Sequence, residues 1–345
     1  MQRVPGHPGR DPPGTDGDAL MREYRFERPG TVTEAVRRSG SDTAYLAGGT
    51  TLVDLMKLEV MTPGRVLDIN RLPLRGLDAT GGGLRIGALE RMTDVAADPR
   101  VRLGYPMLSQ ALELSASGQL RNMASIGGNL LQRTRCGYFR DVSMPCNKRQ
   151  PGSGCPAIRG ENRMHAVLGT SDSCVATHPS DLAVALAALD ARVQLQGRDG
   201  VRTVNLCDFY LLPADTPHLE HDLRPGELVT GVIVPRLDWA QRSIYLKIRD
   251  RQSYEFALSS AAVAIRREGD TIVEARVAVG GMGTRPWRLP AVERALAGRP
   301  ATSNTYAAAA TATVDGTRPL RHNAFKPELM QRTLIRALLE LEQTR

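Results

Sequence analysis

The sequence predicts an α+β protein with two domains. Its 345 residues are roughly twice the ~150 residues of a typical domain. Apolar residues make up 41% and charged residues 24%, a balance that is typical of a chain that buries a core. Short strand and helix patterns alternate at first, whereas the last third reads as a β-hairpin followed by helices. The longest apolar runs are far shorter than the ~20 residues of a membrane span, so no membrane span is expected.

The first part of the chain predicts a tail and then a mixed set of short elements. Residues 1–20 contain four Pro and four Gly and predict a disordered tail. Thr31 and Glu34 form a capping box that opens a short helix. The elements expected after it are a buried strand at 44–47, a helix from Leu52, strands at 65–69 and 84–88, a short helix capped by Thr93 and a longer helix at 108–117.

Residues 130–175 interrupt this pattern, because Pro and Gly recur and no period survives. An irregular stretch of this length inside a compact domain is either disordered or fixed in place by other parts of the protein or by a ligand. Regular patterns then return, as a helix at 181–190, strands at 192–195, 201–204, 228–234 and 243–248, a hairpin of 261–265 with 272–279, and helices at 291–297, 306–313 and 329–341.

The pattern changes between residues 235 and 242, and we place the domain boundary there. The prediction is a first domain at 21–240, which contains the irregular insert 130–175, and a second α+β domain at 241–345. The net charge of +8 does not indicate nucleic-acid binding, because aromatic residues are only 4% and no basic stripe is interleaved with them. Nucleic acid is therefore not an expected partner.

Two glycine turns are candidate ligand sites. Ala47-Gly48-Gly49-Thr50 lies between a predicted strand and a predicted helix, and Ser125-Ile126-Gly127-Gly128-Asn129 is a second turn of the same kind. Glycine lets the backbone approach a ligand closely, and exposed N–H groups before a helix suit a diphosphate. Neither turn is a dinucleotide fingerprint or a P-loop, so an ordinary turn remains the alternative for each.

Four of the five cysteines lie within 39 residues, at Cys136, Cys146, Cys155 and Cys174. The segment 132–165 also carries seven basic and two acidic residues, and these cations would stabilise the net −2 charge of a [4Fe-4S]²⁺ cluster bound by four thiolates. The short C-x2-C pairs of zinc ribbons are absent. On this chemistry alone an iron–sulfur cluster, structural zinc, disulfides and free thiols all remain open. Cys207 stands apart and is expected to be a small buried hydrophobe.

Three motifs in order resemble one known family. They are Tyr45-Leu-Ala-Gly-Gly-Thr-Thr-Leu52, Ser125-Ile-Gly-Gly-Asn129 and Ser180-Asp-Leu182. Together they resemble the FAD-binding medium subunit of molybdenum hydroxylases, the family of xanthine dehydrogenase, aldehyde oxidoreductase and carbon monoxide dehydrogenase. The stretch from Gln132 to Cys155 further resembles the bacterial aldehyde oxidoreductase branch, whose FAD subunit carries an additional [4Fe-4S] cluster.

The resemblance implies a fold and a set of site residues. The implied fold is a two-lobed FAD-binding domain of the vanillyl-alcohol-oxidase/PCMH type, followed by a smaller α+β domain with an antiparallel sheet and helices. The implied cluster ligands are the four cysteines of the insert. The implied FAD-binding residues are Leu46, Ala47, Gly48, Gly49, Thr50, Thr51, Leu52, Ser125, Ile126, Gly127, Gly128, Asn129, Asp181 and Lys247.

The function that the resemblance implies is electron transfer within an oxidoreductase complex. A large molybdopterin-binding subunit would oxidise an aldehyde, and a small [2Fe-2S] subunit would pass the electrons to FAD in this chain and on to an external acceptor. No catalytic acid or base is expected in this chain. The alternatives are a stand-alone FAD oxidase or reductase, and a scaffold subunit with structural zinc. No export signal is visible, so a cytoplasmic location is expected, with co-export to the periplasm on a partner's signal as the alternative.

Overall fold

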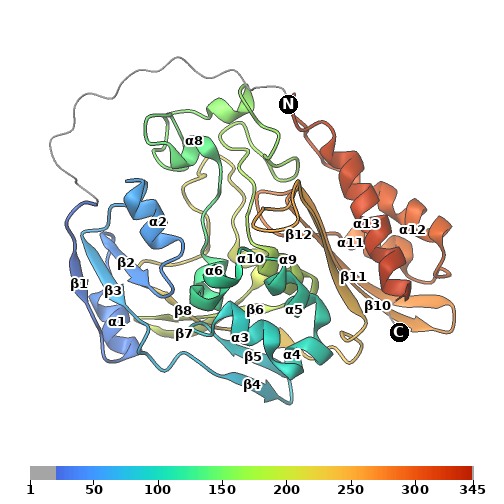
Figure 1. Cartoon of the computed structure of the whole chain (residues 1–345), viewed down its shortest axis with the longest axis horizontal. Helices are drawn as coiled ribbons and strands as arrows, with labels where there is room; N and C mark the ends of the chain where they lie inside the picture. Colours follow the sequence, from blue (N-terminus) through green and yellow to red (C-terminus); the bar gives the residue numbers. More distant parts are fainter. Residues whose placement is uncertain (1–20, 344–345) are drawn as a thin grey trace.

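The computed structural model describes residues 21–343, and the predicted disordered tail at 1–20 lies outside them. The described chain forms three sheets with helices between and around them (Figure 1). The first sheet is parallel, in the order β1-β3-β2. Its elements and the two helices beside it are β1 (Arg25–Glu27), α1 (Val32–Arg38), β2 (Thr43–Leu46), α2 (Leu52–Lys57) and β3 (Arg65–Asp68).

The second sheet has five strands in the order β4-β5-β8-β6-β7, and all of its pairs are antiparallel. The strands are β4 (Leu77–Thr80), β5 (Gly83–Gly87), β6 (Arg192–Gly197), β7 (Gly200–Asn205) and β8 (Leu228–Pro235). The helices that connect β5 to the insert are α3 (Met92–Ala97), α4 (Pro99–Gly104), α5 (Pro106–Glu113), α6 (Gly118–Met123) and α7 (Ile126–Leu130).

The third sheet is antiparallel, in the order β12-β11-β10-β9, and it carries the last three α-helices on one face (Figure 1). Its strands are β9 (Ser243–Ile248), β10 (Ser259–Glu268), β11 (Thr271–Gly280) and β12 (Trp287–Arg288). The helices are α11 (Pro290–Leu296), α12 (Ser303–Ala310) and α13 (Lys326–Gln343), and a 3-10 turn, η2 (Thr311–Val314), follows α12. The predicted α+β class and the C-terminal hairpin are confirmed.

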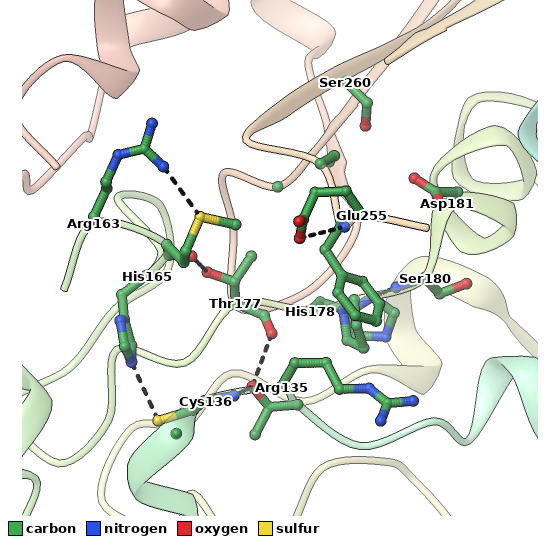
Figure 2. A pocket seen from close by; sticks show the side chains of 18 of the residues that line it. Arg135, Cys136, Arg163, His165, Thr177, His178, Ser180, Asp181, Glu255 and Ser260 are labelled. Atoms are coloured by element: carbon green, nitrogen blue, oxygen red, sulfur yellow. Dashed lines mark hydrogen bonds between the residues drawn. The ribbon is translucent and has the colours of Figure 1, made fainter. Parts of the chain in front are cut away.

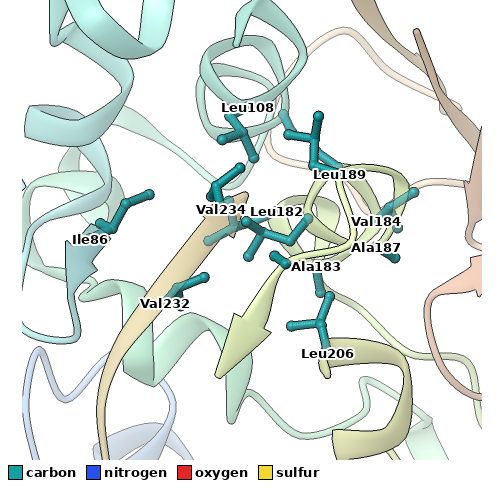
Figure 3. Close-up of a cluster of buried hydrophobic side chains, with 14 of the residues drawn as sticks. Ile86, Leu108, Leu182, Ala183, Val184, Ala187, Leu189, Leu206, Val232 and Val234 are labelled. Carbon is teal, nitrogen blue, oxygen red and sulfur yellow. The ribbon is translucent and has the colours of Figure 1, made fainter. Parts of the chain in front are cut away.

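The main core continues from the second sheet to the third. Every residue of α9 (Asp181–Ala188) is buried, as expected for a helix that is apolar on all sides (Figure 3). Strand β10 is buried on both faces because alternate residues point to opposite sides. Ala262 and Ala264 join the core around α9, whereas Val263 and Ile265 pack towards α11–α13. The second and third sheets therefore share a packed boundary.

The insert 130–175 is ordered but irregular, with one short helix, α8 (Gly137–Arg140), and one 3-10 turn, η1 (Pro156–Ile158). Of the two alternatives that the sequence left open, the structure favours a segment that is held in place. Backbone bonds join it to itself, such as Asn147 N–H to Gly154 O at 2.8 Å, and to the C-terminal part of the chain, such as Val167 N–H to Met282 O at 2.8 Å. Helix α10 (Leu206–Phe209) lies beyond the insert.

Several local predictions can be checked. Thr31 caps α1 as predicted, because its hydroxyl accepts the N–H of Glu34 at 3.1 Å. The prediction that Thr93 is a cap is wrong: α3 begins at Met92, and the Thr93 hydroxyl bonds to Asn122 at 2.7 Å instead. The predicted helix at 108–117 starts and ends earlier, and the predicted buried strand at 44–47 is only half-buried in the structure.

The change from the second sheet to the third falls between Pro235 and Ser243. Because the core crosses this point, the division into domains at residue 240 stays a prediction. None of the helices within residues 21–343 is long and apolar enough to cross a membrane.

Candidate functional site

The first glycine turn lies against the residues that immediately precede the second glycine turn. Gly48 sits so close to the end of α6 that a Cβ at this position would lie 2.0 Å from the Met123 carbonyl oxygen. Ser125 caps α7, and its hydroxyl accepts the N–H of Gly128 at 3.2 Å. Only glycine permits the close contact between Gly48 and Met123, because any Cβ would clash with the carbonyl oxygen. This contact brings the first turn next to the start of the second.

A cavity of about 430 Å³, which we call the turn cavity, opens beside these turns. This volume falls in the range of small-molecule and cofactor sites. Six of the predicted FAD-binding residues line it: Thr50, Thr51, Gly128, Asn129, Asp181 and Lys247. The remaining wall residues are Asp54, Met92, Ser115, Ala116, Leu120, Ala124, Gln132, Arg135, Arg140, Pro179, Arg251, Tyr254, Glu255 and Phe256.

The other eight predicted FAD-binding residues do not line the turn cavity. They are Leu46, Ala47, Gly48, Gly49, Leu52, Ser125, Ile126 and Gly127. Ile126 is fully buried in the main core, and the N–H of Gly127 donates to Ala88 O at 2.8 Å. Ile126 and Gly127 therefore hold the second turn in place without lining the cavity. Direct contact between the eight residues and a cofactor stays a prediction.

Asp181 and Lys247 form a buried ion pair in the cavity wall. The Lys247 ammonium lies 2.7 Å from Asp181 Oδ2. The lysine side chain is 1% exposed and the aspartate side chain 7%. Tyr245 donates its hydroxyl to Asp181 Oδ1 at 2.7 Å, and burial together with this carboxylate raises the Tyr245 pKa well above its ordinary value. This burial shows that Lys247 is not a solvated lysine on the surface of the strand.

The ammonium of Lys247 retains capacity for a ligand. Of its three N–H donors, one serves Asp181 and another donates to Leu114 O at 3.1 Å. The pair is also joined to the second glycine turn through Ser180, which caps α9 and donates to Asn129 Oδ1 at 2.6 Å. The wall thus combines a positive charge with a rigid hydrogen-bonded support.

Two arginines of the insert fasten it to α2. Arg135 and Arg140 lie 3.1 Å and 2.8 Å from Asp54 Oδ2, and the hydrogen bond from Arg140 is the main cause of the lowered Asp54 pKa. The Arg135 guanidinium also lies 5.3 Å from the centre of the Phe256 ring. The basic composition of the insert was visible in the sequence, but the partner of each arginine was not.

The four cysteines of the insert line a single small cavity, which we call the cysteine cavity, together with Phe139, Lys148 and His165 among others. All four are free thiols. Burial, and to a lesser extent the neighbouring thiols of Cys146 and Cys155, raises the pKa of Cys136 to about 12. Burial likewise raises the pKa values of Cys155 and Cys174. Cys207 lies elsewhere, partly buried against the main core.

The thiols are grouped but not tightly clustered. Within residues 21–343, no set of three or more His, Cys, Asp or Glu side chains is arranged to hold a metal ion. Binding of a metal centre would require these thiols to lose their protons, because a coordinating thiol is deprotonated. Four cysteines around one cavity supply the kind of thiolate donor set that an iron–sulfur centre uses.

A third cavity has a volume of about 580 Å³, and Figure 2 shows side chains that line it. It shares lining residues with each of the other two cavities. Cys136, Tyr138 and His165 belong to both this cavity and the cysteine cavity. Arg135, Pro179, Asp181, Glu255 and Phe256 belong to both this cavity and the turn cavity. We call it the central cavity, and it borders both candidate sites.

The fold and these turns define a class of flavoprotein, and comparisons with known proteins identify it. Residues 22–237 match the family described as the FAD binding domain in molybdopterin dehydrogenase, and residues 244–341 match the C-terminal domain of the CO dehydrogenase flavoprotein. The chain therefore belongs to the FAD-binding subunits of the molybdopterin dehydrogenases, which are oxidoreductases of several subunits. The predicted family, fold and FAD cofactor are confirmed.

Among individual proteins, the chain is 48% identical over 325 residues to the aldehyde oxidoreductase FAD-binding subunit PaoB of Escherichia coli strain K12, covering 93% of this chain and 98% of PaoB. It is 30% identical to the glyceraldehyde dehydrogenase medium chain of Sulfolobus acidocaldarius, with 80% and 82% covered. A solved structure of carbon monoxide dehydrogenase from Hydrogenophaga pseudoflava matches with a TM-score of 0.73 and 26% identity, covering 94% of this chain and 99% of that one. These descriptions name no iron–sulfur cluster in this subunit.

Proposed function

We propose that this chain is the electron-transfer flavoprotein subunit of a molybdenum-dependent aldehyde oxidoreductase. The observation that carries the proposal is the turn cavity, where both glycine turns and the Asp181–Lys247 pair form one wall. FAD bound there would accept and release electrons, and the protein would position and tune it. The expected partners are a large molybdopterin-binding subunit and a small [2Fe-2S] subunit. The 48% identity to an aldehyde oxidoreductase subunit supports an aldehyde as the substrate of the complex.

The proposed division of labour among subunits is tested with the intact complex and the isolated chain. The purified complex should contain FAD and molybdenum and should oxidise aldehydes with an artificial electron acceptor. The isolated chain should bind FAD but show no aldehyde turnover, because no catalytic group is assigned to it. Turnover of a small substrate by the isolated chain would favour the alternative, a stand-alone flavin oxidase or reductase.

We further propose that Cys136, Cys146, Cys155 and Cys174 hold a [4Fe-4S] cluster. The support for this proposal is that all four cysteines line one cavity, and a [4Fe-4S] cluster takes four cysteine thiolates as its ligands. The basic residues of the insert would offset the negative charge of the centre, and Lys148 lines the cysteine cavity directly.

Metal analysis of two matched cysteine variants tests the cluster. The wild-type complex should contain about four iron atoms and four acid-labile sulfides in addition to those of its [2Fe-2S] subunit. Cys155→Ser should lose the additional iron, whereas Cys207→Ser should retain it, because Cys207 lies outside the cysteine cavity. One equivalent of zinc without additional iron would select the scaffold alternative.

A further inference from the structure

The imidazole of His165 contacts one cysteine of the insert. Its Nε2 lies 3.2 Å from Cys136 Sγ, and the residue is 7% exposed. Figure 2 shows the His165 ring directed at this sulfur in the wall between the central cavity and the cysteine cavity. Of the four cysteines, Cys136 is the one that lines the central cavity. The contact therefore lies on the side of the cysteine cavity that faces the turn cavity.

The position of His165 is set from two directions. Its backbone N–H donates to Asn162 O at 3.0 Å, and its own carbonyl accepts Nδ2 of Asn323 at 3.2 Å. Asn162 and Asn323 are both fully buried, and Asn323 lies just before α13 in the C-terminal part of the chain. These bonds fix the backbone of His165, from which the imidazole reaches Cys136.

The direction of the hydrogen bond follows from the two ring nitrogens. His165 Nδ1 is buried and has no hydrogen-bond partner among residues 21–343. A neutral imidazole carries one N–H, and a thiolate that binds a metal can only accept. With a metal-bound Cys136, the tautomer that satisfies the contact has its proton on Nε2 and donates it to the sulfur. This bond draws electron density from the ligand and stabilises the more negative, reduced form of the centre.

We propose that His165 is a positioning residue that raises the reduction potential of the centre by donating Nε2–H to the Cys136 thiolate. The proposal rests on the proposed [4Fe-4S] cluster. Hydrogen bonds to ligand sulfurs and solvent exposure are among the factors that set cluster potentials. The first factor acts here, because His165 supplies the bond to Cys136 Sγ.

The test is a redox titration of the additional cluster, followed by EPR, in the purified complex. His165→Leu removes the donor, and His165→Gln restores an N–H at similar reach. His322→Gln is the matched control, because this histidine pairs with Glu161 at 3.0 Å and is not a wall residue of the cysteine cavity. We expect the leucine variant to shift the reduction equilibrium about tenfold towards the oxidised form, or about 59 mV for one electron. The glutamine variant should recover much of this shift, and the control should show none.

A fully loaded His165→Leu complex with the wild-type potential would overturn the inference. If the leucine variant fails to assemble the cluster, pulsed EPR of the wild-type complex with ¹⁵N-labelled histidine decides the matter. A histidine nitrogen coupled to the reduced cluster supports the bond, and the absence of any such coupling refutes it. A wild-type complex without the additional iron would instead contradict the proposed cluster, so the two failures are distinguishable.

Discussion

Gly48→Ala tests whether the close approach of the two turns builds the FAD site. An alanine Cβ would lie 2.0 Å from Met123 O, whereas ordinary contact begins at 3.4 Å, so the first turn must move by 3.4 − 2.0, or about 1.4 Å. The oxygen cannot yield easily, because Arg91 donates to it. Overpacking of this kind costs roughly 1–3 kcal/mol. If the turn moves, that cost weakens FAD binding by about 5- to 150-fold, since ~1.4 kcal/mol is tenfold.

The assay compares the FAD-to-protein ratio, the Kd for FAD and the melting temperature of the complex. If the turn does not move, FAD affinity is unchanged and the strain lowers the stability of the folded protein instead. In that case the melting temperature should fall. Gly81→Ala is the control, because a Cβ there meets nothing within 4 Å. A Gly48→Ala complex with unchanged FAD affinity and unchanged melting temperature would refute the reasoning.

Three further predictions concern buried ionisable side chains. Lys247→Met leaves the Asp181 carboxylate buried without its cation, so chemical denaturation should show a loss of about 3–5 kcal/mol, and a loss below ~1 kcal/mol would contradict the buried pair. Burial lowers the pKa of Lys326 from 10.5 to about 7, so the unfolded chain binds the extra proton between these values. The free energy of unfolding should therefore rise with pH over this window, and Lys326→Met should remove that rise. Burial lowers the pKa of His178 from 6.5 to about 3, so stability should fall as pH drops through this range, and less so in His178→Gln, as measured by melting temperature.

Sequence motifs predict some parts of the candidate site but not the contacts between them. The glycine spacing predicts two candidate ligand turns, at 47–50 and 125–129, and residues of both turns line the same cavity. The pairing of Asp181 with Lys247 was not predicted, although each residue had been named. Their contact depends on how α9 packs against β9 and β10, and no local pattern carries that information. The same holds for Asp54, which becomes part of the wall through two arginines from the insert.

The sequence by itself determined the class of fold, the cap at Thr31, the C-terminal hairpin, the buried helix after Ser180 and the family. Each of these follows from periodicity, a cap or a motif that spans a few residues, and such signals act over short range. The tertiary structure alone decided which distant groups meet: Gly48 at the end of α6, four cysteines around one cavity and His165 at Cys136. These contacts join segments that are tens of residues apart. Their distances are set by sheet register and core packing, which depend on the whole chain at once.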